Sequence, residues 1–367
     1  MSQRIRATID RSALSHNLGI AQACARGARV LAMIKANAYG HGLAGAADAL
    51  HGADAFGVTD IDEAEQLRAG GADKPILILQ GLIDRSDIPR IALQGFQLVV
   101  PRLEHLAWLE EDLPKLALAE PLTFWLKLDS GMGRLGLAPQ DFAAAFRNLQ
   151  AKAWCKEVVM ITHLANASLP DSPLNQQQLA CFAQLHEELR YVPHMTSIGA
   201  SAALLALDTQ ADWARPGIML YGSSPFAWND TTRRRENFGL KPAMTLEARL
   251  LHVADHKAGD NIGYNSQFIC PCPMRVGIVA CGYADGYPSN TPNGSPVAIC
   301  GRRTATLGRV SMDMLAIDLS TIPEAQPGMF AELWGNTVSL DEVAAHTGIL
   351  SYNLTCSVSP RVPRSYL

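Results

Sequence analysis

Short apolar runs alternate with amphipathic segments along the first 220 residues. Asp10 precedes a helical pattern over 11–25 and is a suitable N-cap. The apolar runs fall at 30–34, 55–58, 76–79, 97–100, 123–128, 158–162, 195–198 and 217–220, with helical patterns at 61–69, 103–113, 139–149 and 176–189. Eight strands in β–α alternation can close a parallel sheet and remove its edges. This pattern predicts a TIM (β/α)8 barrel.

The pattern changes after residue 225. Residues 225–242 are polar and show no periodicity. Beyond them, Val- and Ile-rich segments interrupted by Gly and Pro favour antiparallel β structure, at 246–253, 275–279, 296–299 and 314–317, with one late helix at 340–346. We therefore expect a barrel domain over 1–235 and a mainly antiparallel β domain over 236–367. Residues 1–10 could instead contribute a strand to the second domain.

Composition narrows the class of protein. A chain of 367 residues is long enough for two domains, and 48% hydrophobic with 18% charged residues is ordinary for a globular enzyme. The formal net charge of −4 gives no case for nucleic-acid binding, and no apolar stretch reaches membrane-spanning length. The N-terminus does not resemble a signal peptide. The eight cysteines are scattered, which favours a reduced, cytoplasmic protein.

The first candidate for chemistry is Lys35, which directly follows the apolar run at 30–34. Burying an ammonium group is costly unless the group is paired or used chemically. A partly desolvated lysine is typical of Schiff-base formation, in which the neutral amine attacks a carbonyl. A lysine just past a strand can also simply extend to solvent. Its place at the carboxyl end of a barrel strand favours the chemical role, because barrel enzymes keep their active sites on that face.

The same segment allows a different class of enzyme. Residues 40–45 read Gly-x-Gly-x-x-Gly between a strand and a helix, and Asp60 ends the next strand, as in dinucleotide-binding folds. An NAD-dependent dehydrogenase is therefore the alternative. Five residues, 35–39, separate the strand from the first glycine, and a doubly wound fold does not need eight strands. Both observations weigh against the dehydrogenase.

Two motifs together point to a known family. Residues 35–42 (KANAYGHG) resemble the pyridoxal-phosphate lysine motif of alanine racemases, and residues 282–287 (GYADGY) resemble the tyrosine motif of that family. The resemblance implies interconversion of L- and D-alanine with pyridoxal 5′-phosphate held on Lys35. It implies two bases, Lys35 for the proton of the D-enantiomer and Tyr283 for the opposite face. It also implies a head-to-tail homodimer in which each active site combines Lys35 of one chain with Tyr283 of the other.

The resemblance also suggests the remaining site residues. Arg134 and the backbone amide of Met312 would bind the substrate carboxylate, and Lys127 matches a lysine that is carbamylated in many members. A chain of hydrogen bonds from Tyr283 through His163 to Arg215 would help the tyrosine to lose its proton. The residues expected to bind the cofactor are Lys35, Tyr39, His163, Ser201, Arg215, Gly217, Ile218 and Tyr352.

One of these assignments has a physical reason, and two positions near the site differ from the family pattern. An arginine facing the pyridine nitrogen donates a hydrogen bond without giving up a proton, so it weakens the ring as an electron sink. Arg215 would thereby favour racemisation over transamination. Ser130 stands where the family has threonine, and Ala200 stands where many relatives have asparagine, which removes one donor to the phosphate. Ser201 could alternatively cap a helix at 202–207.

Two other pyridoxal-phosphate proteins share parts of the pattern. A barrel decarboxylase begins with a similar lysine motif, but its glycine-rich phosphate loop is missing from this sequence. The small barrel that carries pyridoxal phosphate has no C-terminal β domain, so residues 240–367 argue against it.

Overall fold

The computed structural model describes residues 3–367, so Met1 and Ser2 of the predicted first domain lie outside the described residues. The chain forms two compact units. The barrel unit comprises Leu18–Ala38 and Ala47–Leu220, and the β unit comprises residues 3–17, Tyr39–Ala46 and Tyr221–Leu367. The domain boundary that we expect after residue 235 remains a prediction.

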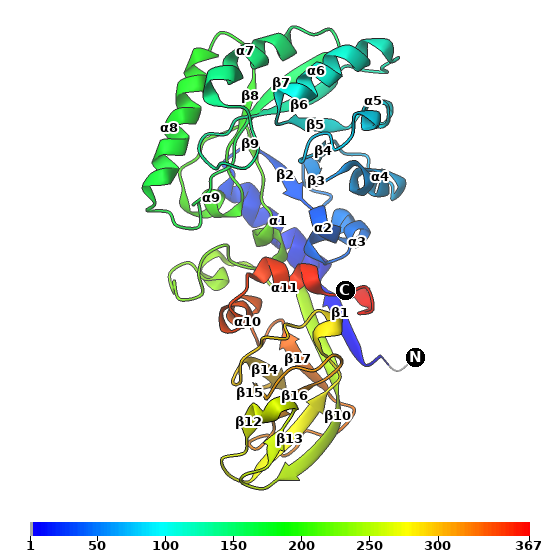
Figure 1. Ribbon diagram of the computed structural model, residues 1–367, viewed down its shortest axis with the longest axis vertical. Helices are drawn as coiled ribbons and strands as arrows, with labels where there is room; N and C mark the ends of the chain where they lie inside the picture. Colours follow the sequence, from blue (N-terminus) through cyan, green and yellow to red (C-terminus); the bar gives the residue numbers. More distant parts are fainter. Residues whose placement is uncertain (1–2) are drawn as a thin grey trace. The chain divides into compact units, whose positions relative to one another are not determined.

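The barrel unit contains a closed barrel of parallel strands, shown in the upper part of Figure 1. Because both faces of such a sheet are covered, its strands are continuous apolar runs, and β3 and β4 are buried at every position. The strands are β2 (Arg29–Met33), β3 (Ala55–Val58), β4 (Ile76–Ile78), β5 (Gln97–Val100), β6 (Leu122–Lys127), β7 (Cys155–Ile161), β8 (Met195–Ser197) and β9 (Trp213–Ala214). The predicted barrel is confirmed.

The eighth predicted strand, at 217–220, is wrong. The last barrel strand is the two-residue β9, which pairs with β8 through Ser197 and Trp213 and closes the barrel through Val30 and Ala214. Residues Ile218–Tyr221 instead form a 3-10 helix. Pro216 lacks an N–H and has a fixed φ, so the strand cannot continue through it in the middle of a sheet.

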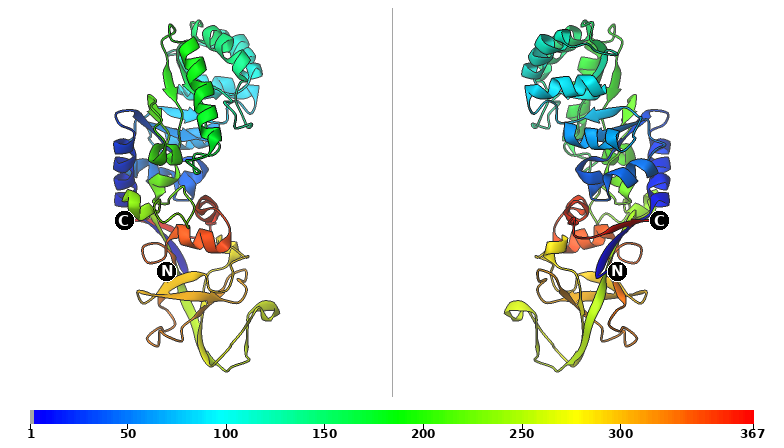
Figure 2. Two further views of the ribbon diagram at one scale, coloured as in Figure 1. Left: turned by 90° about the vertical axis from the view of Figure 1, so that its left-hand side faces the viewer. Right: turned by 90° about the vertical axis from the view of Figure 1, so that its right-hand side faces the viewer.

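Helices follow most of the barrel strands. A further helix, α1 (Arg11–Cys24), precedes the first barrel strand. Asp10 caps it, because the Asp10 carboxylate accepts a hydrogen bond from Ala13 N at 3.0 Å, as predicted. The cyan to green helices α6 to α8 lie outside the strands in both views of Figure 2. The helical segments of this part of the chain are α1 (Arg11–Cys24), α2 (Lys35–Tyr39), α3 (Leu43–Ala49), α4 (Ile61–Ala69), α5 (Ile88–Gln94), α6 (Leu103–Asp112), α7 (Pro139–Gln150), α8 (Pro173–Glu188) and α9 (Ser201–Ala206).

The β unit is built on a mainly antiparallel sheet, as predicted. The strand order is β13-β16-β15-β14-β17-β10-β1-β18, and β13 also pairs with β10. The strands are β1 (Ile5–Ile9), β10 (Met244–His256), β13 (Met274–Val279), β14 (Pro296–Ile299), β15 (Arg302–Leu307), β16 (Leu315–Asp318), β17 (Phe330–Trp334) and β18 (Arg364–Tyr366). A separate hairpin joins β11 (Asn261–Ile262) to β12 (Phe268–Ile269). The first strand, β1, pairs antiparallel with β10 and parallel with β18.

The sequence pattern did not predict every element of this unit. The hairpin of β14 and β15 turns through Cys300 and Gly301, which have φ angles of 53° and 68°. A two-residue turn with both φ angles positive usually carries Asn-Gly or Asp-Gly, so Cys-Gly gave no turn signal. The late helix is α10 (Leu340–Thr347), close to its predicted range, and α11 (Ser351–Ser357) follows it. Among residues 3–367, no helix combines the length and the apolar character needed to cross a membrane.

Candidate active site

Lys35 directly follows β2 and Ile34 at the carboxyl end of the barrel, where barrel enzymes place their chemistry. The turn that begins at Lys35 is left-handed. Ala36, Asn37 and Ala38 have φ angles of 54°, 53° and 54°, and Tyr39 continues at 50°. A left-handed turn costs about 1–2 kcal/mol per residue for L-amino acids, and only Asn among these four tolerates it readily. Such strain is kept only where surrounding contacts hold it, which is typical of functional sites.

Arg215 lies inside the barrel unit and is only 4% exposed. Its guanidinium donates to the carbonyl oxygens of Thr162 at 2.7 Å and Ile198 at 3.0 Å, and to Ser197 Oγ. All these acceptors are neutral. Burial lowers the pKa of Arg215 to about 9, which still leaves the side chain charged at neutral pH. The barrel therefore holds a buried cation in a fixed orientation without a carboxylate against it.

His163 follows β7 and lies beside Arg215, with its Nδ1 3.4 Å from the guanidinium Nη2. Burial, and after it the charges of Arg215, Arg134, Lys127 and Lys35, lower the pKa of His163 to about 3. The imidazole is therefore neutral at physiological pH. The same four cations show that one end of the barrel has a strongly positive electrostatic environment.

Lys127 ends β6 within this cluster. Burial, and after it the charges of Arg215, Arg134 and Lys35, lower the pKa of Lys127 to about 8, although Asp129 acts in the opposite direction. Within residues 3–367, no ion pair joins Lys127, Arg134 or Arg215 to a carboxylate. Buried or crowded cations are usually paired, so this group has the electrostatic character of an anion-binding site.

Ser201 and the loop after β9 meet in the same unit. The Oγ of Ser201 accepts hydrogen bonds from Gly217 N at 2.9 Å and Met219 N at 3.3 Å. Ser201 is the first residue of α9, and Ala200 occupies the N-cap without a side-chain hydrogen bond. The alternative in which Ser201 caps a helix at 202–207 is therefore wrong. The serine joins the loops after the seventh and eighth barrel strands, where barrels commonly bind phosphate.

Tyr283 lies in the β unit, on a short turn that packs against the segment of Met312. Tyr283 N donates to Ser311 O at 3.1 Å, and Ala284 N donates to Met312 O at 3.0 Å. A Cβ atom on Gly282 would lie 2.2 Å from Ser311 O, so only glycine allows this close approach. Among the described residues, the N–H of Met312 donates to no protein acceptor.

A buried carboxylate fixes the Tyr283 turn. Asp285 is fully buried and accepts a hydrogen bond from Gly282 N at 3.0 Å. Arg4 and Arg361 both form ion pairs with it, and Arg361 also pairs with Asp313. Charge-assisted hydrogen bonds of this kind are stronger than neutral ones. This network couples the turn of Tyr283 to the residue that follows Met312, and the sequence pattern had given Asp285 no role.

Tyr352 lies at the start of α11, next to Tyr39, whose ring centroid is 6.0 Å away. Burial raises the pKa of Tyr352 to about 12, with a smaller effect of Asp341, so its hydroxyl keeps its proton and can donate a hydrogen bond.

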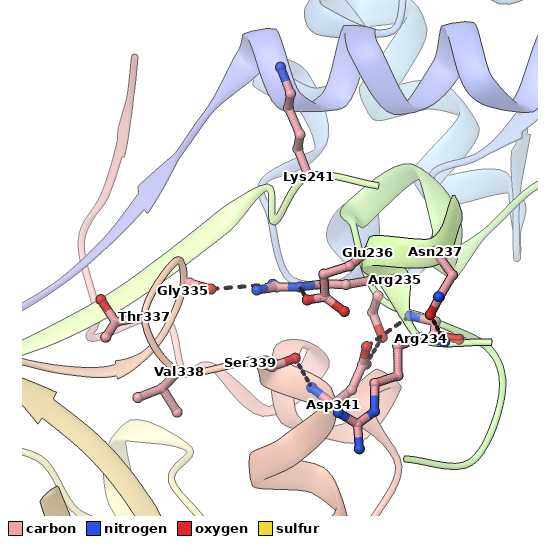
Figure 3. A network of polar contacts seen from close by, with 12 residues as sticks. Arg234, Arg235, Glu236, Asn237, Lys241, Gly335, Thr337, Val338, Ser339 and Asp341 are labelled. Carbon is pink, nitrogen blue, oxygen red and sulfur yellow. Dashed lines mark hydrogen bonds and ion pairs between the residues drawn. The ribbon is translucent and has the colours of Figure 1, made fainter. Parts of the chain in front are cut away.

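Figure 3 shows Asp341 at the N-terminal end of α10, where its N–H donates to Ser339 Oγ. The Ser223 hydroxyl contacts both the Asp341 carboxylate and Ser351 Oγ.

The glycines that suggested a dinucleotide site have another explanation. A Cβ atom on Gly40 would lie 1.9 Å from Thr355 O, and one on Gly42 or Gly45 would lie 2.1–2.2 Å from the Tyr366 side chain. The glycines allow α11 and β18 to approach this segment closely. Asp60, the other part of that pattern, caps α4 by accepting a hydrogen bond from Glu63 N.

The structure therefore gathers the predicted site residues into two groups. The β unit contains Tyr39, Tyr283, Met312 and Tyr352. The barrel unit contains Lys35, Lys127, Arg134, His163, Ser201, Arg215, Gly217 and Ile218. Sequence reasoning missed Glu63, Ser197 and Asp285, because each acts through hydrogen bonds to residues far away in the chain.

Comparison with known proteins identifies the family of this chain. The family model described as the N-terminal domain of alanine racemase matches residues 9–225, and the model of the C-terminal domain matches residues 243–366. An alanine racemase from Pseudomonas taetrolens is 44% identical over 364 residues, covering 99% of this chain and 98% of that protein.

Solved structures give the same result. The biosynthetic alanine racemase from Pseudomonas aeruginosa has a TM-score of 0.92 and 41% identity, covering 100% of this chain and 99% of the other. An alanine racemase from Bartonella henselae, described with covalently bound pyridoxal phosphate, has a TM-score of 0.87 and 27% identity, with 100% of both chains covered. These matches span both units of the present structure, and the chain therefore belongs to the alanine racemase family, a family of isomerases.

Proposed function

We propose that this protein interconverts L- and D-alanine with pyridoxal 5′-phosphate bound at Lys35. The observation that carries this proposal is the cluster of Lys35, Lys127, Arg134 and Arg215 around a neutral His163 at one end of the barrel. Within the described residues Arg134 and Arg215 form no ion pair with a carboxylate, so they are suited to an anionic cofactor and to the carboxylate of an amino acid.

The residues of the chain fit this cofactor. Ser201 and the loop of Gly217 and Ile218 would hold the phosphate, and within residues 3–367 no protein acceptor takes the N–H of Ile218. Tyr39 and Tyr352 are the further cofactor-binding residues that we propose, while His163 would lie near the ring and Arg215 would donate to its pyridine nitrogen. When bound, the cofactor supplies a carbonyl for the Lys35 amine and an electron sink for the substrate Cα.

Two bases are needed because one side chain cannot easily reach both faces of the substrate Cα. Lys35 would take or return the proton on the D-face, and Tyr283 would do so on the L-face. Arg134 and the N–H of Met312 would bind the substrate carboxylate. Because Nδ1 of the neutral His163 faces a guanidinium N–H of Arg215, its Nε2 carries the proton and can donate a hydrogen bond to the Tyr283 oxygen, which supports loss of the proton from Tyr283.

The direct test is conversion of each alanine enantiomer by the purified protein with added pyridoxal phosphate. Since the enantiomers have equal free energies, both reactions should end at equal amounts of L- and D-alanine, as measured by chiral chromatography. No conversion of either enantiomer, or reduction of a nicotinamide cofactor instead, would overturn the proposal. Activity on serine can be measured in the same assay, because a pocket discriminates a single added hydroxyl only weakly.

We predict that Lys127 is carbamylated. With a pKa of about 8, about one amine in ten is neutral at pH 7, compared with about three in ten thousand at the ordinary lysine value. The neutral amine can react with CO2, and the resulting anion would attract Arg134 instead of repelling it. Protein equilibrated with ¹³C-bicarbonate should show a carbamate NMR signal that Lys127→Ala abolishes.

The same variant has a kinetic signature. Lys127→Ala should reduce turnover by about tenfold to a hundredfold, because Arg134 loses its hydrogen-bonding partner, and small carboxylates such as acetate should restore part of the activity. Lys152→Ala is the matched control, since it removes a lysine paired with Glu110 and should keep wild-type activity. Full activity of Lys127→Ala without added carboxylate would exclude the carbamate.

We further propose a homodimer in which each active site combines residues of both chains. The turn around Tyr283 supports this, because Tyr283, Met312 and Met314 are 46%, 53% and 44% exposed in the single chain. Large apolar side chains that are exposed on adjacent segments are typical of an interface. A twofold dimer would bring the same surface of each chain to its partner and create two equivalent sites.

Mixing two inactive variants tests the shared site. Lys35→Ala and Tyr283→Phe would each be nearly inactive as homodimers. After mixing and re-equilibration, half of the dimers would carry one site with both defects and one intact site, so activity should recover to about a quarter of wild type. If each site used residues of one chain only, every site would keep a defect and mixing would restore nothing.

The biological setting is also a proposal. The enzyme would act in the cytoplasm, supplying D-alanine as a peptidoglycan precursor or degrading it. The eight cysteines are scattered along the chain, which favours a reduced compartment. We propose no nucleic-acid or membrane partner, on the grounds of the net charge of −4 and the absence of a membrane-spanning apolar stretch.

A further inference from the structure

The left-handed turn after Lys35 depends on one carboxylate. Glu63 Oε1 accepts hydrogen bonds from Ala36 N at 2.6 Å and from Asn37 N at 3.3 Å. Its other oxygen, Oε2, accepts from Thr59 N at 2.8 Å. One side chain thus joins the turn that follows the first barrel strand to the end of the second barrel strand.

We propose that Glu63 is a positioning residue for Lys35: by holding the left-handed turn, it sets where the Lys35 amine lies. This inference rests on the proposed function of Lys35. Glu63 does not touch the reacting atoms; it acts through the backbone of the two residues that follow the lysine.

The geometry explains why the turn needs an acceptor from outside. Within the turn, Ala38 N donates back to Ile34 O at 2.8 Å. The N–H groups of Ala36 and Asn37 instead donate to Glu63. Without the carboxylate these two donors would lose a charged acceptor, and the strained conformation would lose the contacts that compensate for it.

Glu63 is itself held in place by a hydrogen bond, and its carboxylate forms no ion pair among the described residues. It lies in the first turn of α4, where its own N–H donates to the capping carboxylate of Asp60 at 3.1 Å. Among the described residues, no cation forms an ion pair with Glu63. Glu65, two residues further along, instead pairs with Arg90. The two acids therefore have different roles on one helix, and Glu65 provides a matched control.

The test compares Glu63→Gln with Glu65→Gln and with the double variant Ala36→Gly/Glu63→Gln. Glutamine keeps the size of Glu63, but one of the two carboxylate oxygens is replaced by an NH2 group, which donates hydrogen bonds and does not accept them. Glutamine therefore cannot use one oxygen for Thr59 N and the other for the turn, as Glu63 does. Glycine at position 36 adopts positive φ without steric cost, so it should hold the turn with less help from Glu63. If Glu63→Gln acts through the turn, Ala36→Gly should recover the loss; if it destabilises the barrel in general, Ala36→Gly should not.

Three measurements are made on each variant. Thermal unfolding without cofactor reports the fold, and titration with pyridoxal phosphate followed by visible absorbance reports binding. The primary isotope effect with Cα-deuterated D- and L-alanine reports proton transfer at each base. A misplaced Lys35 slows the step in which lysine takes the proton, so the effect should increase for D-alanine. For L-alanine the other base takes the labelled proton and the slowed lysine step follows, so the effect should decrease towards its equilibrium value.

We expect Glu63→Gln to lower the midpoint of thermal unfolding, weaken cofactor binding, and reduce turnover by about tenfold to a hundredfold, because two N–H groups of the turn lose a charged acceptor. Ala36→Gly should recover at least half of each change, and Glu65→Gln should match wild type. If Glu63→Gln behaves like Glu65→Gln, or if glycine recovers nothing, Glu63 does not position the lysine.

The unfolding measurement also separates two kinds of failure. If wild-type protein neither binds pyridoxal phosphate nor racemises alanine, the proposed function is wrong and Lys35 has no amine chemistry for Glu63 to position. A lowered unfolding midpoint with recovery by glycine would then show only that Glu63 holds the turn. If the wild type is active and the glycine rescue fails, the function stands and the role of Glu63 is wrong.

Discussion

Replacing Lys35 by alanine should abolish racemisation in both directions. The variant loses the amine that we propose attaches the cofactor, which is also one of the two proposed bases. Covalent attachment and proton transfer each contribute large factors to catalysis. We expect a loss of more than about ten-thousandfold in turnover, since general base catalysis alone contributes up to that factor. Visible absorbance of the protein mixed with pyridoxal phosphate should also lose the band of the lysine-bound form.

The control for this variant lies in the same cluster. Lys127→Ala removes another lysine close to Arg215 and His163 but leaves the attachment point intact, so it should still show the lysine-bound absorbance. Activity that survives in Lys35→Ala would contradict the assignment. So would an unchanged absorbance, because the cofactor would then be attached elsewhere.

Replacing Tyr283 by phenylalanine should reduce racemisation by about a hundredfold to ten-thousandfold, the usual contribution of one positioned base. Because the two enantiomers are equally stable, kcat/KM must fall by the same factor in both directions. The loss therefore does not reveal which face Tyr283 serves. Exchange of the Cα proton with solvent does, since each base exchanges only the proton on its own face.

In deuterium oxide, Tyr283→Phe should still exchange the Cα proton of D-alanine through Lys35 and should fail to exchange that of L-alanine. NMR of the Cα proton measures the rate for each enantiomer in a separate sample, because the two enantiomers give the same spectrum. Replacement of Tyr287 by phenylalanine is the matched control, because this second tyrosine of the motif is fully buried in the β unit and should not carry protons. Retained exchange of L-alanine in Tyr283→Phe would exclude it as the base for that face.

The parts of the fold that the sequence predicted correctly are those set by local patterns. Strands β2 to β7 contain buried apolar runs, and such runs are recognisable without tertiary information. Strand β9 has only Trp213 and Ala214, too few residues to produce a periodicity. The apolar residues at 218–220 that suggested a strand are buried for a different reason, within a 3-10 helix.

The site shows the same division. The motif around Lys35 could be recognised from its residues, but the left-handed conformation of Ala36 and Ala38 could not, because alanine has no preference for it. That conformation depends on Glu63, 27 residues away from Ala36 in the chain. Likewise, nothing near Arg215 in the sequence indicates that its acceptors are Thr162, Ser197 and Ile198.

The glycines at 40, 42 and 45 show how a short motif can mislead. Their spacing matched a dinucleotide-binding loop, yet each glycine leaves room for Thr355 or Tyr366 from the end of the chain. Close backbone approach was the correct physical reason for glycine at these positions. What the glycines approach could be learned only from the structure.

The central claim is that Lys35 holds pyridoxal phosphate, and one measurement tests it most directly. Purified protein loaded with the cofactor is reduced with borohydride, digested, and mapped by mass spectrometry. The account predicts a pyridoxyl group on the peptide that contains Lys35, with Lys127 and the other lysines unmodified. A pyridoxyl group on a different lysine, or a protein that takes up no pyridoxyl group at all, would contradict it.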